Sequence, residues 1–575
     1  MKKGLLILFI VTIYLFFSCN NSFKRPVDKS TADTIYYGGN IITMEGDFVN
    51  YVEAIAVKDG KIIFAGTKSD ANKLNGTHTK MNDLEGKTLL PGFVDGHSHF
   101  SEVGLQSVSA NLLSPPDGPV KNIDELQKVL REFMAVSPIV KAHQIVLVMN
   151  YDNSQLKEQR SPIRQELDAV STQLPIIVIH QSGHLAVLNS KALAMVGITA
   201  DSKNPDGGII EREADGKTPN GVLQENAFFQ IIPKLPLKFT PEEVASMIQT
   251  SEAIYIKNGF TTIQDGKTTP VNIKVLPELA KKGAFKVDIV SYPDLVLLSK
   301  DSILRGPLMS KKYTNHFRIG GVKITMDGSP QGKTAWFTQP YYKVPAGQDS
   351  TYAGYPAFTD EKLIKWFELA YKNNWQLLTH TNGDAAIDQL IRMDKAAAIK
   401  YPAKDRRTVM IHGQFLRHDQ VKEIMDADIF ASLFPLHTFN WGDFHRQSVV
   451  GPERAENMSP TGWLLENKMK FSIHSDAPVI FPNSMQLIST AVNRTTRTNY
   501  LLGPKQKISP YVALQAMTIW PAYQHFEEDV KGSLVKGKNA DFVILDQNPI
   551  KADPKKINEI KVMETIKEGK TVYKN

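Results

Sequence analysis

Residues 91–99 read PGFVDGHSH and place two histidines one residue apart at the end of a short apolar run. Successive side chains of a β-strand point to opposite faces, so His97 and His99 are expected to point the same way. Two imidazoles on one face can hold a single metal ion, although two structural histidines would give the same pattern. The meaning of this pair therefore depends on further ligand-type residues at other strand ends.

The length and charge of the chain narrow the class of protein. Its 575 residues exceed one ordinary core, and a large barrel with additional units suits this length. The chain carries 67 basic and 60 acidic residues, a net charge of +7, and no long basic run. This balance argues against nucleic acid as a partner and against a polybasic membrane patch. A monomer and a homo-oligomer both stay open.

The first residues have the pattern of a bacterial lipoprotein signal. Lys2-Lys3 is followed by the apolar stretch Gly4–Phe17, which is too short to predict a membrane span. Cys19, the only cysteine, follows a small residue, although a plain secretory signal with an incidental cysteine would look similar. We expect a signal over residues 1–19 and a tether over 20–32. The protein would then be exported to the bacterial cell envelope, free of disulfides and attached to a membrane surface by a lipid on Cys19.

Short strands joined by turns mark both ends of the remaining chain. Asp59-Gly60 between two apolar runs predicts a β-hairpin. Residues 542–545 and 562–573 show the same style of strand and turn near the C-terminus. We therefore expect residues 33–90 and 529–575 to form one small β domain, with two unrelated tails as the alternative.

The middle of the chain alternates apolar strands with helical stretches, as in parallel α/β proteins. Thr240 and the proline after it predict the start of a helix over residues 241–258. Eight strands and their helices fit a (β/α)₈ barrel over residues 91–528. The predicted strands are Gly92–His97, Thr261–Gln264, Phe285–Ser291, Phe317–Thr325, Trp375–Thr379, Thr408–His412, Ile429–Leu433 and Lys470–His474.

Residues 101–238 do not fit the count of barrel units. They lie between the first two predicted strands and contain strand and helix patterns of their own. The loops after barrel strands build the catalytic face of such proteins. We therefore predict a large insertion that covers the site.

Four more strand ends carry residues that bind metals or move protons. Lys323, His380, His412 and Asp476 each lie at or just after the C-terminal end of a separate predicted strand. Any one of them alone would be an ordinary polar or turn residue. Together with the histidine pair they form one ordered set at the end of the barrel where catalytic residues gather.

Eight motifs resemble the amidohydrolase superfamily, in particular its YtcJ-like branch (amidohydrolase family 3), which includes N-substituted formamide deformylases. The resemblance covers nearly the whole chain after the signal. It implies a metal-dependent barrel with a composite β-sandwich made from the N- and C-terminal segments. The motifs are PGFVDGHSHF, SGHLAVLNSKAL, GVLQENA, GGVKITMDGS, THTNGDAAID, IHGQ, HSDAPV and GSLVKGKNADFVILDQNP.

The resemblance also implies a role for each residue of the set. His97 and His99 would bind a first metal, and His380 and His412 a second. Lys323 would be carboxylated and bridge the two, since a buried lysine readily loses its proton and a neutral amine reacts with carbon dioxide. Asp476 would be both a ligand and the proton-transferring base. Nitrogen and oxygen ligands favour two Zn²⁺, with Mn²⁺, Co²⁺ or Fe²⁺ as alternatives.

Other residues are candidates for roles around the metals. His184 and Glu225 lie in the predicted insertion, where family-like motifs suggest catalytic or substrate-binding roles, with simple packing as the alternative. His437 follows the seventh predicted strand and is a candidate substrate-binding residue. Asp265 follows the second strand, as a turn residue or as an orienter of a ligand. His474 departs from the family, whose members often carry a small residue before the Ser-Asp pair.

The predicted activity is hydrolysis of a non-peptide carbon–nitrogen bond in a small amide or N-substituted formamide. A metal-activated hydroxide would attack the carbonyl, and Asp476 would pass the proton to the leaving nitrogen. One alternative is a mononuclear, deaminase-like amidohydrolase. Another, of a different class, is an inactive barrel that binds a ligand at the cell surface.

Overall fold

The computed structural model describes residues 31–575 except 116, 237–238 and 346. The predicted signal, Cys19 and most of the tether lie outside the described residues. Within them, no helix combines the length and the apolar character needed to cross a membrane.

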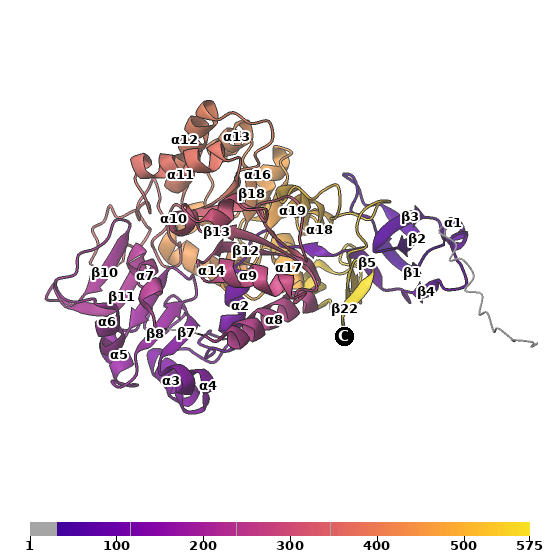
Figure 1. The fold of residues 1–575 in the computed structure, drawn as a ribbon. Coiled ribbons are helices and arrows are strands. Elements are labelled where there is room, and N and C mark those ends of the chain that lie inside the picture. The colour runs from indigo at the N-terminus through magenta and orange to yellow at the C-terminus, as the bar shows by residue number, and fades with distance from the viewer. Residues whose placement is uncertain (1–30, 116, 237–238, 346) are drawn as a thin grey trace, which may run out of the picture.

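Strands from both ends of the chain share one eight-stranded sheet. Its order is β22-β21-β20-β5-β1-β2-β3, with β4 paired to β1. The two ends of the chain join where β5 pairs antiparallel with β20, with Leu90 opposite Val543. Figure 1 shows these strands together on one side of the molecule. The strands are β1 (Thr34–Ile42), β2 (Tyr51–Lys58), β3 (Lys61–Gly66), β4 (Lys80–Asp83), β5 (Thr88–Pro91), β20 (Phe542–Leu545), β21 (Val562–Lys567) and β22 (Lys570–Lys574), with the short helix α1 (Lys68–Asn72) after β3.

The hairpin between β2 and β3 follows from its turn residues. Asp59 and Gly60 both adopt positive φ, 48° and 73°. This conformation suits the right-handed twist of paired strands and favours a glycine in the turn. The local sequence therefore specifies this part of the sheet.

The middle of the chain contributes parallel strands whose spatial order follows the sequence. One sheet has the order β14-β13-β12-β6 and the next has β15-β16-β17-β18-β19. Gly320 links β14 to β15, and its N–H donates to the carbonyl of Ser291 on β13 at 2.9 Å. The strands are β6 (Phe93–Val94), β12 (Phe260–Thr268), β13 (Asp288–Pro293), β14 (Phe317–Ile319), β15 (Gly321–Thr325), β16 (Gln376–Thr381), β17 (Val409–His412), β18 (Phe430–Leu433) and β19 (Phe471–Ile473).

Each predicted strand of the middle segment overlaps at least one of these strands, and three of them differ most from the prediction. The first is only two residues long, because Asp95 turns the chain and accepts the N–H of His97 at 3.3 Å. The fourth is divided at Gly320. The second continues to Thr268 because it pairs with β13 well past its predicted end.

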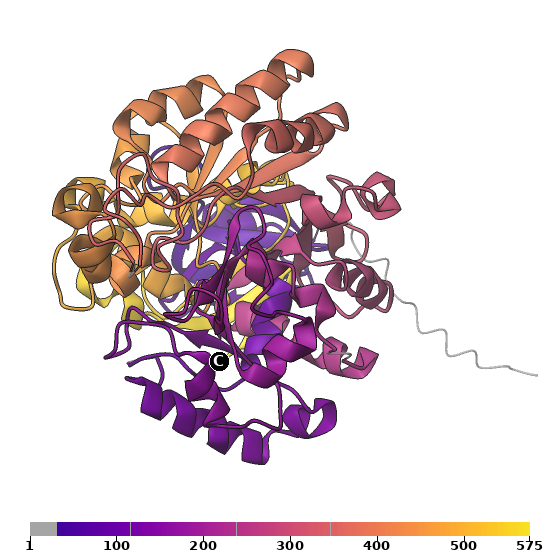
Figure 2. The same ribbon diagram turned by 90° about the vertical axis from the view of Figure 1, so that its left-hand side faces the viewer.

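Helices lie around the parallel strands in Figure 2. Thr240 caps α8 as expected, accepting the N–H of Glu243 at 3.2 Å, while Glu243 accepts the N–H of Thr240. The largest apolar core lies between these helices and the strands. The helices are α8 (Pro241–Lys257), α9 (Asn272–Lys281), α10 (Leu295–Leu298), α11 (Asp360–Lys372), α12 (Asp384–Lys400), α13 (His418–Asp426), α14 (Leu436–Phe444), α15 (Gly451–Ala455), α16 (Thr461–Glu466), α17 (Ser484–Asn493), α18 (Pro510–Gln515) and α19 (Ile519–Gln524).

The segment between β6 and β12 forms a sheet of its own. Its order is β10-β11-β9-β8-β7, and Figure 1 shows it on the side of the molecule away from β1–β4. Apolar cores lie on its faces. Its strands are β7 (Val146–Tyr151), β8 (Ile176–His180), β9 (Leu185–Leu188), β10 (Gly208–Arg212) and β11 (Pro219–Glu225), and its helices are α2 (Phe100–Ser107), α3 (Ile123–Val136), α4 (Pro138–His143), α5 (Arg164–Asp168), α6 (Ser190–Val196) and α7 (Asn226–Phe229).

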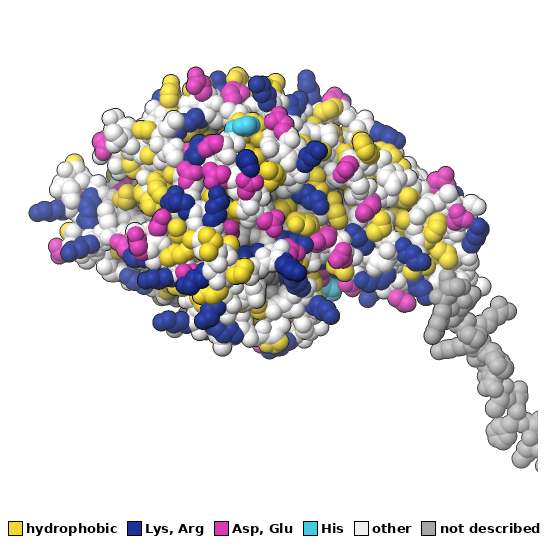
Figure 3. Space-filling model, turned by 90° about the horizontal axis from the view of Figure 1, so that it is seen from above, with side chains coloured by type: hydrophobic (Ala, Val, Ile, Leu, Met, Phe, Trp, Pro, Cys, Tyr) yellow, Lys and Arg dark blue, Asp and Glu magenta, His cyan; other side chains and the backbone are white. Residues whose placement is uncertain are grey.

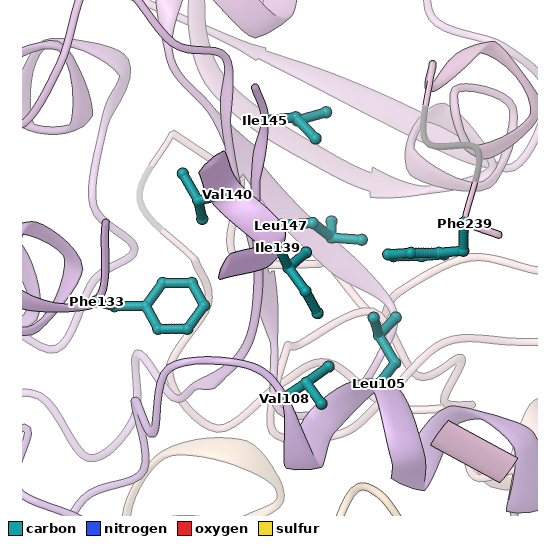
Figure 4. A pocket seen from close by; sticks show the side chains of 8 residues that line it. All are labelled: Leu105, Val108, Phe133, Ile139, Val140, Ile145, Leu147 and Phe239. Carbon is teal, nitrogen blue, oxygen red and sulfur yellow. The ribbon is translucent and has the colours of Figure 1, made fainter. Parts of the chain in front are cut away.

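A small apolar pocket lies beside α2 and β7 (Figure 4). Its empty volume is about 290 Å³, and all eight side chains that line it are apolar. A site that orients a substrate needs some polar groups. We therefore regard this pocket as a packing gap of the segment.

Figure 3 shows basic and acidic side chains interspersed over one face of the molecule.

Candidate metal centre

The predicted set comes together at the C-terminal ends of the parallel strands. His97 and His99 follow β6, Lys323 lies in β15, His380 in β16, and His412 ends β17. Asp476 follows β19. All are buried except His99, whose side chain is 19% exposed.

Asp476 lies close to three of the candidate histidine ligands. Its Oδ1 lies 3.4 Å from Nε2 of His97 and 3.3 Å from Nε2 of His99. Its Oδ2 lies 3.9 Å from Nε2 of His412. His97, His99 and Asp476 offer ligand atoms within 4.8 Å of one another. These three residues are therefore close enough to share one ion.

Lys323, His380 and His412 adjoin this group. Nζ of Lys323 lies 3.1 Å from Nε2 of His97. The rings of His380 and His412 meet edge to face, with centres 4.6 Å apart. All six predicted ligands thus surround one small volume.

Backbone strain accompanies two of these residues. His412 has φ 75° and Asp476 has φ 54°. Non-glycine residues rarely adopt such angles, and strained positions cluster at functional sites. His412 is the last residue of β17, and Asp476 lies in the loop after β19, so both side chains are set by a turn of the chain next to the other candidate ligands.

Unsatisfied buried atoms show that the centre suits a cation. Among the described residues, Nδ1 of His412 and Oδ1 of Asp476 are buried without a hydrogen-bond partner. Leaving such atoms unpaired is costly in a folded protein. A divalent cation with nitrogen and oxygen ligands would satisfy electron pairs of this kind. The residues present therefore fit a metal.

The protonation of the centre also suits metal ligands. Burial lowers the pKa of His97, His380 and His412 well below the usual value, so their imidazoles are neutral. Burial lowers the pKa of Lys323 to about 7, although Asp476 opposes the shift. Metal binding requires deprotonated ligands, and these side chains are close to that state.

Three supporting residues were missed by the sequence analysis. Oε1 of Gln264 accepts from Nδ1 of His97 at 2.6 Å, since an amide oxygen has no hydrogen to donate. Asp95 accepts N–H groups of His97 and Gln264 at 3.3 and 3.2 Å. Asp327 lies 3.4 Å from Nδ1 of His380. Such partners orient the ring of a metal-binding histidine. Asp95 and Asp327 lie within motifs noted in the sequence, but nothing local shows what they contact.

Asp265 is not a turn residue. It lies inside β12 and is buried, and its Oδ1 accepts both N–H and Oγ–H of Ser101 at 2.8 Å. An isolated bridge joins it to His99. It therefore supports the backbone next to a predicted ligand.

A cavity opens onto the centre, with an empty volume of about 220 Å³. Its walls come from the insertion, from the loops after β15 and β18, and from the ligand-bearing strand ends. Ser182 and His184 come from the segment between β6 and β12, so this segment contributes residues to the cavity wall. The lining residues are Ser182, His184, Ser329, Gln331, His380, Asn382, His412, Phe434, His437, Asp476 and Val479.

His184 lies in this wall and is held by Glu225. Nδ1 of His184 donates to Oε2 of Glu225 at 2.6 Å, and Oγ1 of Thr334 donates to Oε1 at 2.6 Å. The ring of His184 lies against that of His380, with centres 4.7 Å apart. Glu225 is buried and has an unusual backbone, φ 51° and ψ −124°. The structure thus fixes the orientation of His184.

His437 also lines the cavity. Its Nδ1 and Nε2 of His445 lie 3.1 Å apart, and burial lowers the pKa of both residues. His437 is therefore a neutral polar group in the wall.

Comparison with known proteins identifies the family. The model of the amidohydrolase family matches residues 80–573. The chain belongs to the amidohydrolase family. Members of this family are typically dependent on divalent metals, which agrees with the fit of the centre to a cation.

Two curated relatives match this amidohydrolase over most of its length. It is 25% identical to the N-substituted formamide deformylase of Arthrobacter pascens, over 91% of this chain and 95% of that protein. It is 24% identical to the putative amidohydrolase YtcJ of Bacillus subtilis, over 94% of this chain and 99% of that protein. The resemblance seen in the sequence motifs is thereby confirmed.

Solved structures show the fold. An uncharacterized metal-dependent hydrolase of Pyrococcus furiosus has a TM-score of 0.68 at 24% identity, covering 90% of this chain and 100% of that one. One of Pyrococcus horikoshii has a TM-score of 0.71 at 22% identity, covering 91% and 99%. The amidohydrolase therefore has the α/β fold of metal-dependent hydrolases.

Proposed function

We propose that this amidohydrolase hydrolyses a carbon–nitrogen bond of a small amide or N-substituted formamide at the centre around Asp476. The observation that carries the proposal is the contact of one carboxylate with three imidazoles at the wall of a cavity. The relative from Arthrobacter pascens, named for action on N-substituted formamides, supports this class of substrate.

We infer two divalent ions, most simply Zn²⁺. His97 and His99 would hold one ion and His380 and His412 the other, with Asp476 as a further ligand. Lys323, buried beside His97, would bridge the two in carboxylated form. Such ions supply an activated water and polarise the carbonyl of the substrate.

The chain's own residues would then position and protonate the substrate. Asp476 faces the cavity and is placed to accept a proton from the attacking water and deliver it to the leaving nitrogen. His184 enters from the insertion with a fixed orientation, so it can hold the substrate or donate a proton on the opposite wall. His437 adds a neutral polar contact.

We further propose that the parallel strands close into a (β/α)₈ barrel over residues 91–528, with residues 101–238 as an insertion. The continuity of the strands through Gly320 and the ordered sequence from β6 to β19 support it. The N–H of His99 donates to the carbonyl of Ala477 at 2.7 Å, so the first and last strand ends touch. The segments 33–90 and 529–575 would be a composite β-sandwich.

The test is hydrolysis of a panel of amides and N-substituted formamides by the metal-loaded wild type, by His97→Ala and by Asp476→Asn. Wild type should release amine, and both variants should lose at least about a hundredfold in rate. Equal inertness of all three, with retained ligand binding, would instead support a surface binding protein.

A mononuclear centre is the second candidate. His97, His99 and Asp476 form a compact ligand group by themselves. Short segments of the chain also match adenine deaminases, one at 44% identity over 72 residues. Metal analysis separates the two: two ions per chain support the amide hydrolase, whereas one ion with an unmodified Lys323 supports the deaminase-like enzyme.

We also propose export to the cell envelope and a lipid anchor at Cys19. The support is the signal pattern in the sequence alone. Wild type should fractionate with membranes and carry a lipid on its N-terminal cysteine by mass spectrometry. Cys19→Ala should be released or remain uncleaved, and an unlipidated wild-type Cys19 would contradict the anchor.

A further inference from the structure

His474 has a buried imidazole with nothing to bind. Its exposed fraction is 1%, and neither Nδ1 nor Nε2 has a hydrogen-bond partner within the described part of the chain. Two other buried histidines of the described chain, His380 and His445, lack a hydrogen-bond partner at Nδ1, but each has one at Nε2. An unpaired buried polar group destabilises a fold and usually indicates a function or a missing ligand.

The position of His474 points to the metal centre. On β19, Ser472 directs its Oγ inward to Ser432 at 2.8 Å. His474 comes two residues later and therefore shares that inward face. Its ring centre lies 5.2 Å from that of His97 and 5.1 Å from that of His412.

These spacings are those of imidazoles on a common ion. A zinc–nitrogen bond of about 2.0–2.1 Å and tetrahedral angles place two ring centres about 5 Å apart. His97 and His99, the predicted pair, have ring centres 5.2 Å apart. The ring centre of His474 therefore lies as far from that of His97 as the ring centre of His99 does, while the most compact group of ligand atoms is that of His97, His99 and Asp476.

The remaining ring neighbour of His474 cannot satisfy it. Phe434 lies with its ring centre 5.0 Å away at an interplanar angle of 57°. Its hydrocarbon ring offers neither a lone pair nor a strong donor. A packing role alone would be filled better by an apolar side chain of similar size.

We propose that His474 is a further ligand of the metal centre, beside His97 and His412. This inference rests on the metal-dependent function proposed above and adds one nitrogen donor to its six-residue set. The additional imidazole would change the coordination number, and with it the preference of the centre among divalent metals.

The experiment compares wild type, His474→Leu and His474→Gln, with His445→Gln as a matched control. His445 is equally buried but contacts His437 rather than the predicted ligands. For each protein, Zn²⁺ affinity is measured by competition with a chelator. The Co²⁺-loaded form is examined by visible absorption and by X-ray absorption, which counts nitrogen ligands.

A role of His474 as a metal ligand and a purely structural role predict opposite results. If His474 is a ligand, metal-free His474→Leu unfolds at the same temperature as metal-free wild type or higher, because an unpaired polar group is gone. The same variant should bind Zn²⁺ at least about tenfold more weakly and lose one nitrogen donor from the Co²⁺ spectrum. His445→Gln should keep the wild-type affinity and spectrum.

Other outcomes would overturn the inference. Unchanged affinity and spectrum in His474→Leu, with lower stability of the metal-free protein, would assign His474 a structural role. Weaker binding with an unchanged nitrogen count would mean that it only hydrogen-bonds a ligand. If wild type itself bound no metal, the proposed function would fail as well, whereas tight binding by wild type and by His474→Leu removes this inference alone.

Discussion

Nδ1 of His184 and Oε2 of Glu225 lie 2.6 Å apart where the insertion meets the cavity. Glu225→Gln keeps the shape of the side chain but removes its charge. We expect kcat to fall roughly tenfold to a hundredfold because His184 loses its orientation, while metal content stays unchanged. Steady-state kinetics and metal analysis of the same preparation measure both.

The control for this variant is Glu211→Gln. Glu211 lies on the neighbouring strand β10 and accepts from Gln224 and Asn220, away from His184. The Glu211→Gln variant should retain wild-type kcat. Equal losses in both variants would mean that the insertion sheet was disturbed, and an unaffected Glu225→Gln would remove His184 from the proposed chemistry.

Lys323 provides a second prediction because its proposed role depends on an added carboxylate. Lys323→Ala should lose activity at least about a hundredfold and bind less metal. A small carboxylic acid such as acetate, at high concentration, should restore part of both, since it supplies the missing oxygen ligands in the space left by the side chain. The carboxylated Lys323 bridge would be contradicted if acetate restored no activity at any concentration and the mass of the wild type showed no modification.

Buried ion pairs outside the centre provide a third prediction, on stability. Asp288 accepts from Lys531 at 2.6 Å and from Lys567 at 2.5 Å, and all three are buried. Asp288→Asn removes the carboxylate that the two ammonium groups share, while Lys531 keeps Glu527 and Lys567 keeps Asp541 as a partner, each at 2.9 Å. We expect a loss of about 1.5–3 kcal/mol in the free energy of unfolding, the range for lost hydrogen bonds to charged groups. Denaturant titration of the metal-free protein measures it.

The matched control is an exposed pair. Asp70 accepts from Lys73 at 2.7 Å, with both side chains largely in solvent. Asp70→Asn should change the free energy of unfolding by less than about 1 kcal/mol. A similarly small effect of Asp288→Asn would show that the buried cluster contributes nothing specific.

The fourth prediction concerns the stability of the protein at acidic pH. Burial alone would raise the pKa of Glu527, but Lys531 and Arg318 lower it from its ordinary 4.5 to about 2. A depressed folded-state pKa stabilises the protein above the unfolded-state value, and that stabilisation is lost as the pH falls. The difference in free energy of unfolding between wild type and Glu527→Gln should therefore be largest above pH 5. It should decrease as the pH falls from about 4.5 to about 2. A difference that is constant over this range would contradict the assignment.

Much of the fold could be predicted because its signals are local. Thr240 and Glu243 are close in sequence, and their reciprocal hydrogen bonds define the start of α8. Asp59-Gly60 likewise specifies its own hairpin. The clustering of the six candidate ligands could also be predicted, because each lies at or just after a strand end and parallel strands bring their ends to one edge.

The supporting residues could not be predicted because their partners are distant in sequence. Gln264 reaches His97 across two neighbouring strands, and Asp327 reaches His380 from a loop. Asp265 was predicted as a turn residue because it follows the second predicted strand. Pairing of β12 with β13 overrides that local signal and keeps the chain extended to Thr268.

The pairing of β5 with β20 has a consequence for how the chain is made. Synthesis proceeds from the N-terminus, so Thr88–Pro91 emerges long before its partner Phe542–Leu545. Until then the edge of β5 offers free N–H and C=O groups, which attract other unpaired strands. A chain cut short before residue 542 would keep that edge permanently open. Premature termination should thus produce a self-associating product rather than a smaller working enzyme.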